Sequence, residues 1–232
     1  MAQTFLITGA NRGIGLEIAR QAAGAGHRVI ATARRPGDAS ALNDAAKATG
    51  PGVIEVVGAD VTDPGQLAGI AEGEKAPIEL LVCNAGQYLA RGGIDDPAYS
   101  ADAWQDVLMT NVAGVFFTVR AFLPHLERAN RGRVAVVSSI MASSARAPGG
   151  SYIYRSSKAA VTNLARNLAM DLKAHGVAVG AYHPGWVRTD MGGTQADIDV
   201  AESASGLLAR FEALDLSATG VFEDYQGKAI PY

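Results

Sequence analysis

The chain has 232 residues, of which 48% are hydrophobic and 19% charged, and its formal net charge is −3. This slightly acidic balance argues against a nucleic-acid-binding protein, which usually carries a clustered basic face. The single cysteine, Cys83, excludes an intramolecular disulfide framework. Because it lies in an apolar run, we expect it to be a core residue and not a catalytic thiol.

The length suits one large α/β domain, and no linker or fixed-period repeat divides residues 1–232. The first residues lack a basic leader region and lead directly into a strand pattern. No apolar run approaches the ~20 residues that cross a bilayer. We therefore expect a cytoplasmic, single-domain protein without a membrane segment.

Short apolar runs alternate with longer segments of helical periodicity along the chain. The runs predict strands at 4–8, 28–33, 53–57, 80–84, 133–138, 177–183 and 220–222. The periodic segments predict helices at 13–25, 39–49, 64–71, 102–126, 151–174 and 199–214. This alternation is typical of a doubly wound parallel sheet, the Rossmann fold, in which ligands bind beyond the carboxyl ends of the strands.

A glycine-rich turn, TGANRGIG, follows the first predicted strand and opens the first helix. Glycines let backbone N–H groups approach a pyrophosphate, and the helix N-terminus favours negative charge. The alternative is an ordinary strand-to-helix turn. The candidate cofactor contacts here are Gly9, Asn11, Arg12, Gly13, Ile14 and Gly15.

The second and third strands each end in residues suited to a nucleotide. Arg34 and Arg35 stand where an NAD site usually has an acidic residue, and guanidinium groups suit a 2′-phosphate, so NADP(H) is favoured over NAD(H). Which arginine dominates stays open, and both could be surface charges. Asp60 and Val61 are candidate adenine contacts, with an N-cap at Asp60 as the alternative.

Tyr154 and Lys158 are four residues apart in the helix predicted at 151–174. The spacing puts phenol and ammonium on one face, where the lysine charge would lower the pKa of the tyrosine and make it a proton-transfer group. The alternative is a half-buried tyrosine with a solvated lysine.

Taken in order, these motifs resemble the short-chain dehydrogenase/reductase family along nearly the whole chain. Further matching segments are Asn84-Ala85-Gly86, Asn111, Ser138-Ser139 and 184–190, with sequence PGWVRTD. Within the family, the segments YRSSKAA, HPGW and GKAIP look like the C-factor/sniffer-type carbonyl reductases.

The resemblance implies roles for individual residues. Asn84, Ala85 and Gly86 would support the sheet beside the adenine ribose. Asn111 would hold a water that contacts Lys158, with a helix cap or kink as the alternative. Thr189 would bond the nicotinamide carboxamide, Val187 would offer backbone groups, and Pro184 and Gly185 would shape the turn.

The catalytic serine is expected to be Ser139, although Ser138 stays open. The usual family spacing would pair Ser139 with Tyr152, but only Tyr154 has a lysine four residues later, so we infer a two-residue expansion of loop 140–150. The two serines face opposite sides of an extended strand.

These assignments predict an NADP-dependent oxidoreductase that interconverts a small-molecule carbonyl and an alcohol, with Tyr154 as acid/base. No metal site is called for. A short flexible lid is expected at about 190–205. Resemblance to family members that pair through their long helices implies a homodimer or homotetramer. The alternative function is a nucleotide-binding signalling protein of the C-factor type with little turnover.

Overall fold

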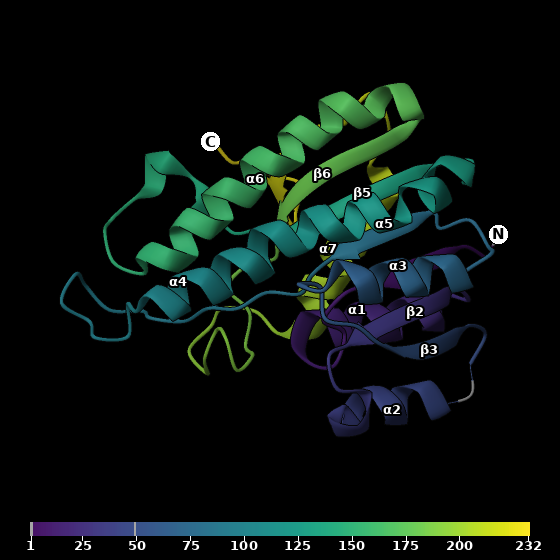
Figure 1. The fold of residues 1–232 in the computed structure, drawn as a ribbon, viewed down its shortest axis with the longest axis horizontal. Helices are drawn as coiled ribbons and strands as arrows, with labels where there is room; N and C mark the ends of the chain where they lie inside the picture. Colours follow the sequence, from purple (N-terminus) through teal and green to yellow (C-terminus); the bar gives the residue numbers. More distant parts are fainter. Residues whose placement is uncertain (1, 49) are drawn as a thin grey trace.

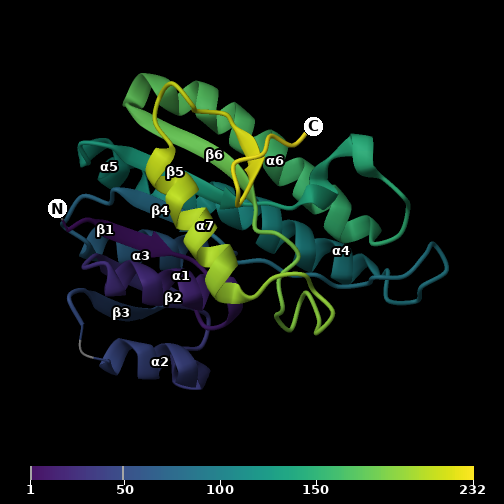
Figure 2. The same ribbon diagram turned by 180° about the vertical axis from the view of Figure 1, so that it is seen from behind.

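The computed structural model describes residues 2–48 and 50–232. Within them, the chain forms a seven-stranded parallel sheet in the order β3-β2-β1-β4-β5-β6-β7, covered by helices on both faces (Figures 1 and 2). The predicted doubly wound Rossmann fold is therefore confirmed. Residues 1 and 49, the first residue of the expected domain and the last of the helix predicted at 39–49, lie outside the described residues.

The elements follow the predicted order, with small shifts at their ends. The strands are β1 (Thr4–Ile7), β2 (Arg28–Ala33), β3 (Val53–Gly58), β4 (Leu80–Cys83), β5 (Gly132–Val137), β6 (Val177–His183) and β7 (Phe222–Asp224). The helices are α1 (Gly13–Gly24), α2 (Ser40–Lys47), α3 (Pro64–Gly73), α4 (Ala101–Leu108), α5 (Gly114–Arg128), α6 (Tyr152–Leu172) and α7 (Val200–Ala213). The strand predicted at 220–222 begins two residues later, because Gly220 takes a turn conformation with φ +90°.

The helix predicted at 102–126 is interrupted. A π-helical turn, Met109–Ala113, joins α4 to α5 and shifts the hydrogen-bond pattern by one residue at Asn111. Such insertions leave the apolar period of a sequence almost unchanged, so periodicity alone predicted one helix.

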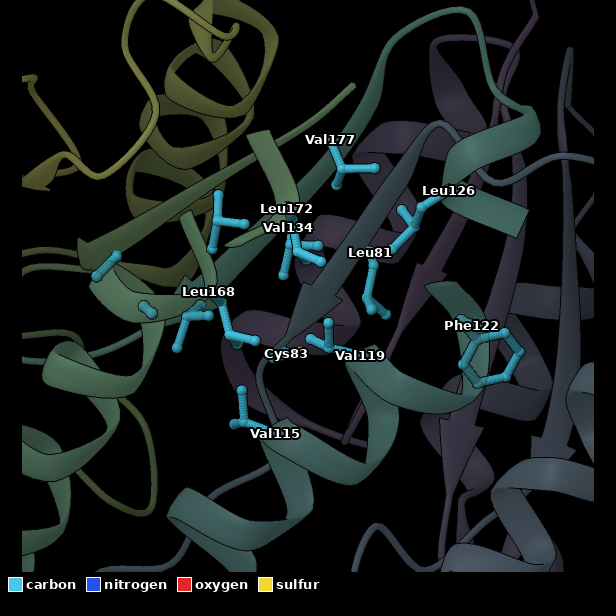
Figure 3. Close-up of a cluster of buried hydrophobic side chains, with 14 of the residues drawn as sticks. Leu81, Cys83, Val115, Val119, Phe122, Leu126, Val134, Leu168, Leu172 and Val177 are labelled. Atoms are coloured by element: carbon cyan, nitrogen blue, oxygen red, sulfur yellow. The ribbon is translucent and has the colours of Figure 1, made fainter. Parts of the chain in front are cut away.

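Two apolar layers hold the fold together. On one face of the sheet, α3, α5 and α6 bury side chains such as Val115, Val119 and Phe122 against Leu81 and Val134 (Figure 3). On the other face, α1, α2 and α7 pack over the same strands (Figure 2). A sheet buried on both faces needs near-continuous apolar strands, which is why the strands are visible in the sequence.

The segment Ala101–Arg128 has the length and composition of a membrane-crossing helix, with a mean hydropathy of 1.5 in its most apolar window. The expectation that no apolar run reaches that length is therefore too strict here. Length and composition are weak evidence, because the core helix of a globular domain passes the same test. In this fold α5 packs its apolar stripe against the sheet.

The strand order reverses between β1 and β4, whose following loops leave the sheet toward opposite faces. In doubly wound sheets this reversal creates a crevice beyond the strand ends. Side-chain caps begin α3 (Asp63), α4 (Ser100) and α7 (Asp199), whereas no side chain caps α1. The N-terminus of α1 therefore keeps its first N–H groups available at the crevice.

Candidate active site

The glycine loop between β1 and α1 packs so closely that side chains would not fit. Gly9 has φ +65°, and a Cβ there would lie 2.8 Å from the Ala85 Cα. A Cβ on Gly15 would lie 2.4 Å from the Asn84 Nδ2 and 2.6 Å from the Gly9 carbonyl oxygen. The first and third glycines are thus required by the local backbone geometry.

Asn84 holds this loop against the end of β4. Its Nδ2 donates to the carbonyl oxygens of Thr8 and Gly9, both at 3.0 Å, and its backbone N–H donates to the Thr8 Oγ1 at 3.0 Å. The resemblance placed Asn84 in support of the central sheet. The structure shows that its side chain braces the glycine loop itself.

A cleft of about 700 Å³ runs along the carboxyl ends of the central strands. Sixteen of the predicted site residues line it: Gly9, Asn11, Arg12, Gly13, Ile14, Gly15, Arg34, Asp60, Val61, Asn84, Ala85, Gly86, Tyr154, Lys158, Pro184 and Thr189. Four others, Asn111, Ser139, Gly185 and Val187, are not among the residues that line it. Residues spread over most of the sequence are thereby brought to one surface.

The arginines predicted at the phosphate end have different partners. Arg12 pairs with Asp190 across the cleft at 2.8 Å, and Arg35 pairs with Asp38 at 3.3 Å; all four side chains are largely exposed. Arg34 lines the cleft and, among the described residues, has no carboxylate within 4 Å. Of the two candidates after β2, Arg34 is the better placed to take an anion.

Asp60 makes a local turn and does not cap a helix. Its Oδ1 accepts hydrogen bonds from the Thr62 backbone N–H and hydroxyl at 2.9 and 2.8 Å. The N-cap of α3 is Asp63, which accepts from the N–H groups of Gly65 and Gln66. The N-cap alternative for Asp60 is therefore wrong.

Tyr154 and Lys158 are both buried on the first turns of α6. The Lys158 Nζ lies 5.6 Å from the Tyr154 ring centre and donates to the Val137 carbonyl oxygen at 2.8 Å. Burial raises the pKa of Tyr154 to about 12, opposed by a hydrogen bond with Ser139 and by the charge of Arg91. Burial also lowers the pKa of Lys158 to about 8.

The expected lowering of the Tyr154 pKa by Lys158 is not found in this arrangement. The i, i+4 spacing did place the two side chains on one face, but the ammonium points to the end of β5. Loss of hydration then dominates both groups, favouring the neutral phenol and weakening proton binding by the amine.

Ser138 lines the cleft and Ser139 does not, but the two hydroxyl groups have different partners. The Ser138 Oγ lies 2.5 Å from the Thr162 Oγ1, on the side facing α6. The Ser139 Oγ accepts the Met141 N–H at 3.1 Å, and Ser139 is close enough to Tyr154 to oppose the rise in the pKa of that phenol. The geometry favours Ser139 over Ser138, and its catalytic role stays a prediction.

Asn111 occupies the centre of the π-helical turn, and its side chain makes hydrogen bonds within the protein. Its Oδ1 accepts the Gln87 N–H at 2.8 Å, and its Nδ2 donates to the Gln87 carbonyl and the Ser157 Oγ, each at 2.9 Å. Asn111 therefore lies inside the π-helical turn and does not cap a helix, and its alternative role as a kink stays a prediction. Binding of a water beside Lys158 stays a prediction.

The segment after β6 is held by several hydrogen bonds. The Trp186 Nε1 donates to the Gly192 carbonyl at 2.9 Å, and Val187 bridges to Ile198. The Thr189 Oγ1 accepts the Gly192 N–H at 3.0 Å. The lid expected at about 190–205 would include the start of α7, which begins at Val200 after its Asp199 cap, and the lid stays a prediction.

The model of the short chain dehydrogenase family matches residues 3–198. The chain belongs to the short-chain dehydrogenase family. It is therefore an oxidoreductase, and the resemblance inferred from its motifs is confirmed.

Several relatives of this short-chain dehydrogenase are informative. C-signal of Myxococcus xanthus is 36% identical over 163 residues, which are 67% of this chain and 93% of that protein. The crystal structure of NADPH-bound carbonyl reductase from chicken fatty liver is 32% identical, with a TM-score of 0.90 over 100% of this chain and 99% of that one. Carbonyl reductase Sniffer of D. melanogaster is 27% identical, with a TM-score of 0.92 over 100% of both chains.

The structure of this short-chain dehydrogenase adds site residues that the sequence did not indicate. Gln87 and Thr110 join the cleft wall, linked by a 2.8 Å hydrogen bond between their side chains. Tyr88 stacks on Tyr154 with ring centres 4.1 Å apart. For Gln87 and Tyr88, the position directly after Asn84-Ala85-Gly86, at the end of a central strand, was the available signal.

Proposed function

We propose that this oxidoreductase is an NADP(H)-dependent carbonyl reductase, which reduces the carbonyl group of a small molecule with Tyr154 as the proton donor. The observation that carries the proposal is the buried pair of Tyr154 and Lys158 in the wall of a cleft that also contains Arg34 and the uncapped start of α1, with Ser139 next to Tyr154. The likeness to a carbonyl reductase that binds NADPH supports it.

The residues of the cleft fit a dinucleotide. The first N–H groups of α1 have no side-chain cap, and Gly9 and Gly13 hold the loop in left-handed conformations that point backbone toward the cleft. Such a helix start attracts a pyrophosphate. The volume of about 700 Å³ also lies in the range of cofactor sites.

Arg34 supports NADP(H) over NAD(H). It stands after β2, where an acidic residue would bond a ribose 2′-hydroxyl, and it is free of carboxylates among the described residues. A guanidinium can bond a 2′-phosphate bidentately and stays charged at all physiological pH values.

When bound, NADPH would supply the hydride. Tyr154 then donates its Oη proton to the carbonyl oxygen, on which negative charge develops. The raised pKa, about 12, keeps the phenol protonated at neutral pH, as a donor must be. Ser139 hydrogen-bonds the same oxygen, and Lys158 adds positive charge behind the tyrosine, so both stabilise the transition state more than the substrate.

The test is the oxidation of NADPH and of NADH by purified protein against ketones, aldehydes and quinones, with Tyr154→Phe and the matched control Tyr152→Phe. Tyr152 precedes the site on α6 and has no lysine four residues later. We expect NADPH-preferring turnover that falls at least a thousandfold in Tyr154→Phe and stays near wild type in Tyr152→Phe. Equal activity of the two variants would refute the role of Tyr154.

The likeness to C-signal favours a second candidate, a nucleotide-dependent signalling protein. In that case NADPH would bind tightly while no carbonyl in the panel is reduced. Binding measured by nucleotide fluorescence, beside the turnover assay, separates the two functions.

A further inference from the structure

Tyr88 forms a fixed wall over the catalytic tyrosine. Its ring stacks on Tyr154 at 4.1 Å with an interplanar angle of 20°, and its hydroxyl lies 2.7 Å from the Ser151 Oγ. One contact fixes the plane of the ring and the other fixes its tip. Tyr88 therefore lies directly beside the tyrosine that lines the cleft.

Arg91 covers the opposite face of Tyr88. Its guanidinium carbon lies 4.4 Å from the Tyr88 ring centre. Because Tyr154 already occupies one face at a similar distance, the guanidinium must lie against the other. Arg91, Tyr88 and Tyr154 therefore form a stack of three side chains. The charge of Arg91 is close enough to lower the pKa of Tyr154.

The Arg91 guanidinium is positioned but not neutralised. Its Nη2 donates to the Met191 carbonyl oxygen at 2.9 Å. Because Met191 lines the cleft, this bond directs the guanidinium toward the rim of the cleft. No carboxylate among the described residues lies within 4 Å of it. The nearby acids are engaged elsewhere, Asp96 by the Gly92 and Ala98 N–H groups and Asp190 by Arg12.

A guanidinium whose partner is a neutral carbonyl oxygen would bind a carboxylate more strongly. A guanidinium presents several N–H donors in a plane, and a carboxylate accepts two of them at once, whereas a neutral carbonyl accepts less strongly. The stacking on Tyr88 restrains the side chain before any ligand binds, so less conformational freedom is lost on binding.

We propose that Arg91 is a specificity-determining residue that selects carbonyl substrates carrying a carboxylate a few bonds from the carbonyl carbon. In this arrangement the carbonyl oxygen faces Tyr154 and Ser139, while the carboxylate passes the edge of Tyr88 and pairs with Arg91. The inference rests on the proposed carbonyl reductase function and adds a substrate class to it.

The experiment compares levulinate with its neutral methyl ester, as substrates with NADPH and as ligands of the NADPH-loaded protein by calorimetry. The variants are Arg91→Met, Arg91→Lys and the control Arg128→Met, an exposed arginine at the end of α5, far from the cleft. We expect wild type and Arg128→Met to favour the acid over the ester by about tenfold in kcat/KM, the effect of one charge-assisted hydrogen bond.

In Arg91→Met that preference should disappear, through a higher KM for the acid with kcat little changed, and Arg91→Lys should retain part of it. Equal losses for acid and ester would mean that Arg91 only braces Met191, and would overturn the inference. So would an absence of preference in wild type, in turnover or in calorimetric binding. Neither outcome touches the proposed function, which stands or falls on Tyr154→Phe with neutral carbonyls.

Discussion

Replacing Lys158 with methionine should make the protein more stable while abolishing turnover. Lys158 is 5% exposed, and among the described residues its ammonium has one hydrogen-bond partner in the protein, the Val137 carbonyl. A buried charge with so little compensation destabilises the folded state, and methionine has a similar length without the charge. The lysine is therefore kept at the expense of stability.

The size of the stabilisation expected for Lys158→Met follows from the pKa of Lys158, which burial lowers from 10.5 to about 8. Each pKa unit corresponds to 1.36 kcal/mol, so holding the charged lysine in the folded state costs about 3 kcal/mol at neutral pH. Methionine removes this penalty but leaves the Val137 carbonyl without a donor, which costs about 1 kcal/mol. The net expectation is a stabilisation of about 2 kcal/mol, or roughly 4–8 °C in Tm.

The pH dependence of this stability difference tests whether the buried charge of Lys158 is its cause. Between pH 8 and 10.5 the unfolded lysine holds a proton that the folded one has lost, so wild-type stability rises with pH in that window. The advantage of Lys158→Met should be full below pH 8 and gone by pH 10.5. Urea unfolding of both proteins from pH 7 to 10.5 measures it. Lys173→Met, at an exposed position, should change stability by less than about 0.5 kcal/mol throughout.

A variant less stable than wild type at pH 7 would refute the reasoning. So would a constant advantage across the pH window, because the gain would then come from packing and not from the buried charge.

Three further predictions concern the cleft and the core. Gly9→Ala should weaken NADPH binding at least tenfold in a fluorescence titration, because the φ of +65° and the 2.8 Å approach to the Ala85 Cα force the loop to move; unchanged affinity would contradict the packing. Asn84→Ala should lower the free energy of unfolding by about 1–3 kcal/mol, since it removes the donor to two carbonyl oxygens, and a loss below about 0.5 kcal/mol in urea would show that the brace is dispensable. Cys83, buried and with its pKa raised to about 12, should not react with Ellman's reagent in the native protein and should react fully in urea; rapid native reaction would show that β4 opens.

The fold was predictable because the central strands are buried on both faces and each helix on one. Burial on two faces makes β4 and the segment 134–137 of β5 continuous apolar runs, and one-sided burial imposes a helical period on α6. Local backbone demands were visible for the same reason. The turn after β1 needs glycine at Gly9, whose φ is +65°, and at Gly15, where a Cβ would lie 2.6 Å from the Gly9 carbonyl oxygen, so part of this demand is visible in adjacent residues.

Other features depend on atoms that lie far apart in the chain. The spacing of Tyr154 and Lys158 put them on one helix face, but the Val137 carbonyl of β5 draws the ammonium aside, and desolvation reverses the expected effect on the tyrosine pKa. The π-helical turn at Asn111 likewise follows from its hydrogen bonds to Gln87 and Ser157, which no periodic pattern records.

The sequence motifs thus predict the fold class, the family and most of the cleft residues, because these depend on local conformation and on which side chains are apolar. The stack of Arg91 and Tyr88 on Tyr154, the choice of Ser139 over Ser138 and the direction of each pKa shift come from the assembled structure. Burial and through-space contact between distant segments set these properties, and neither is a function of spacing along the chain.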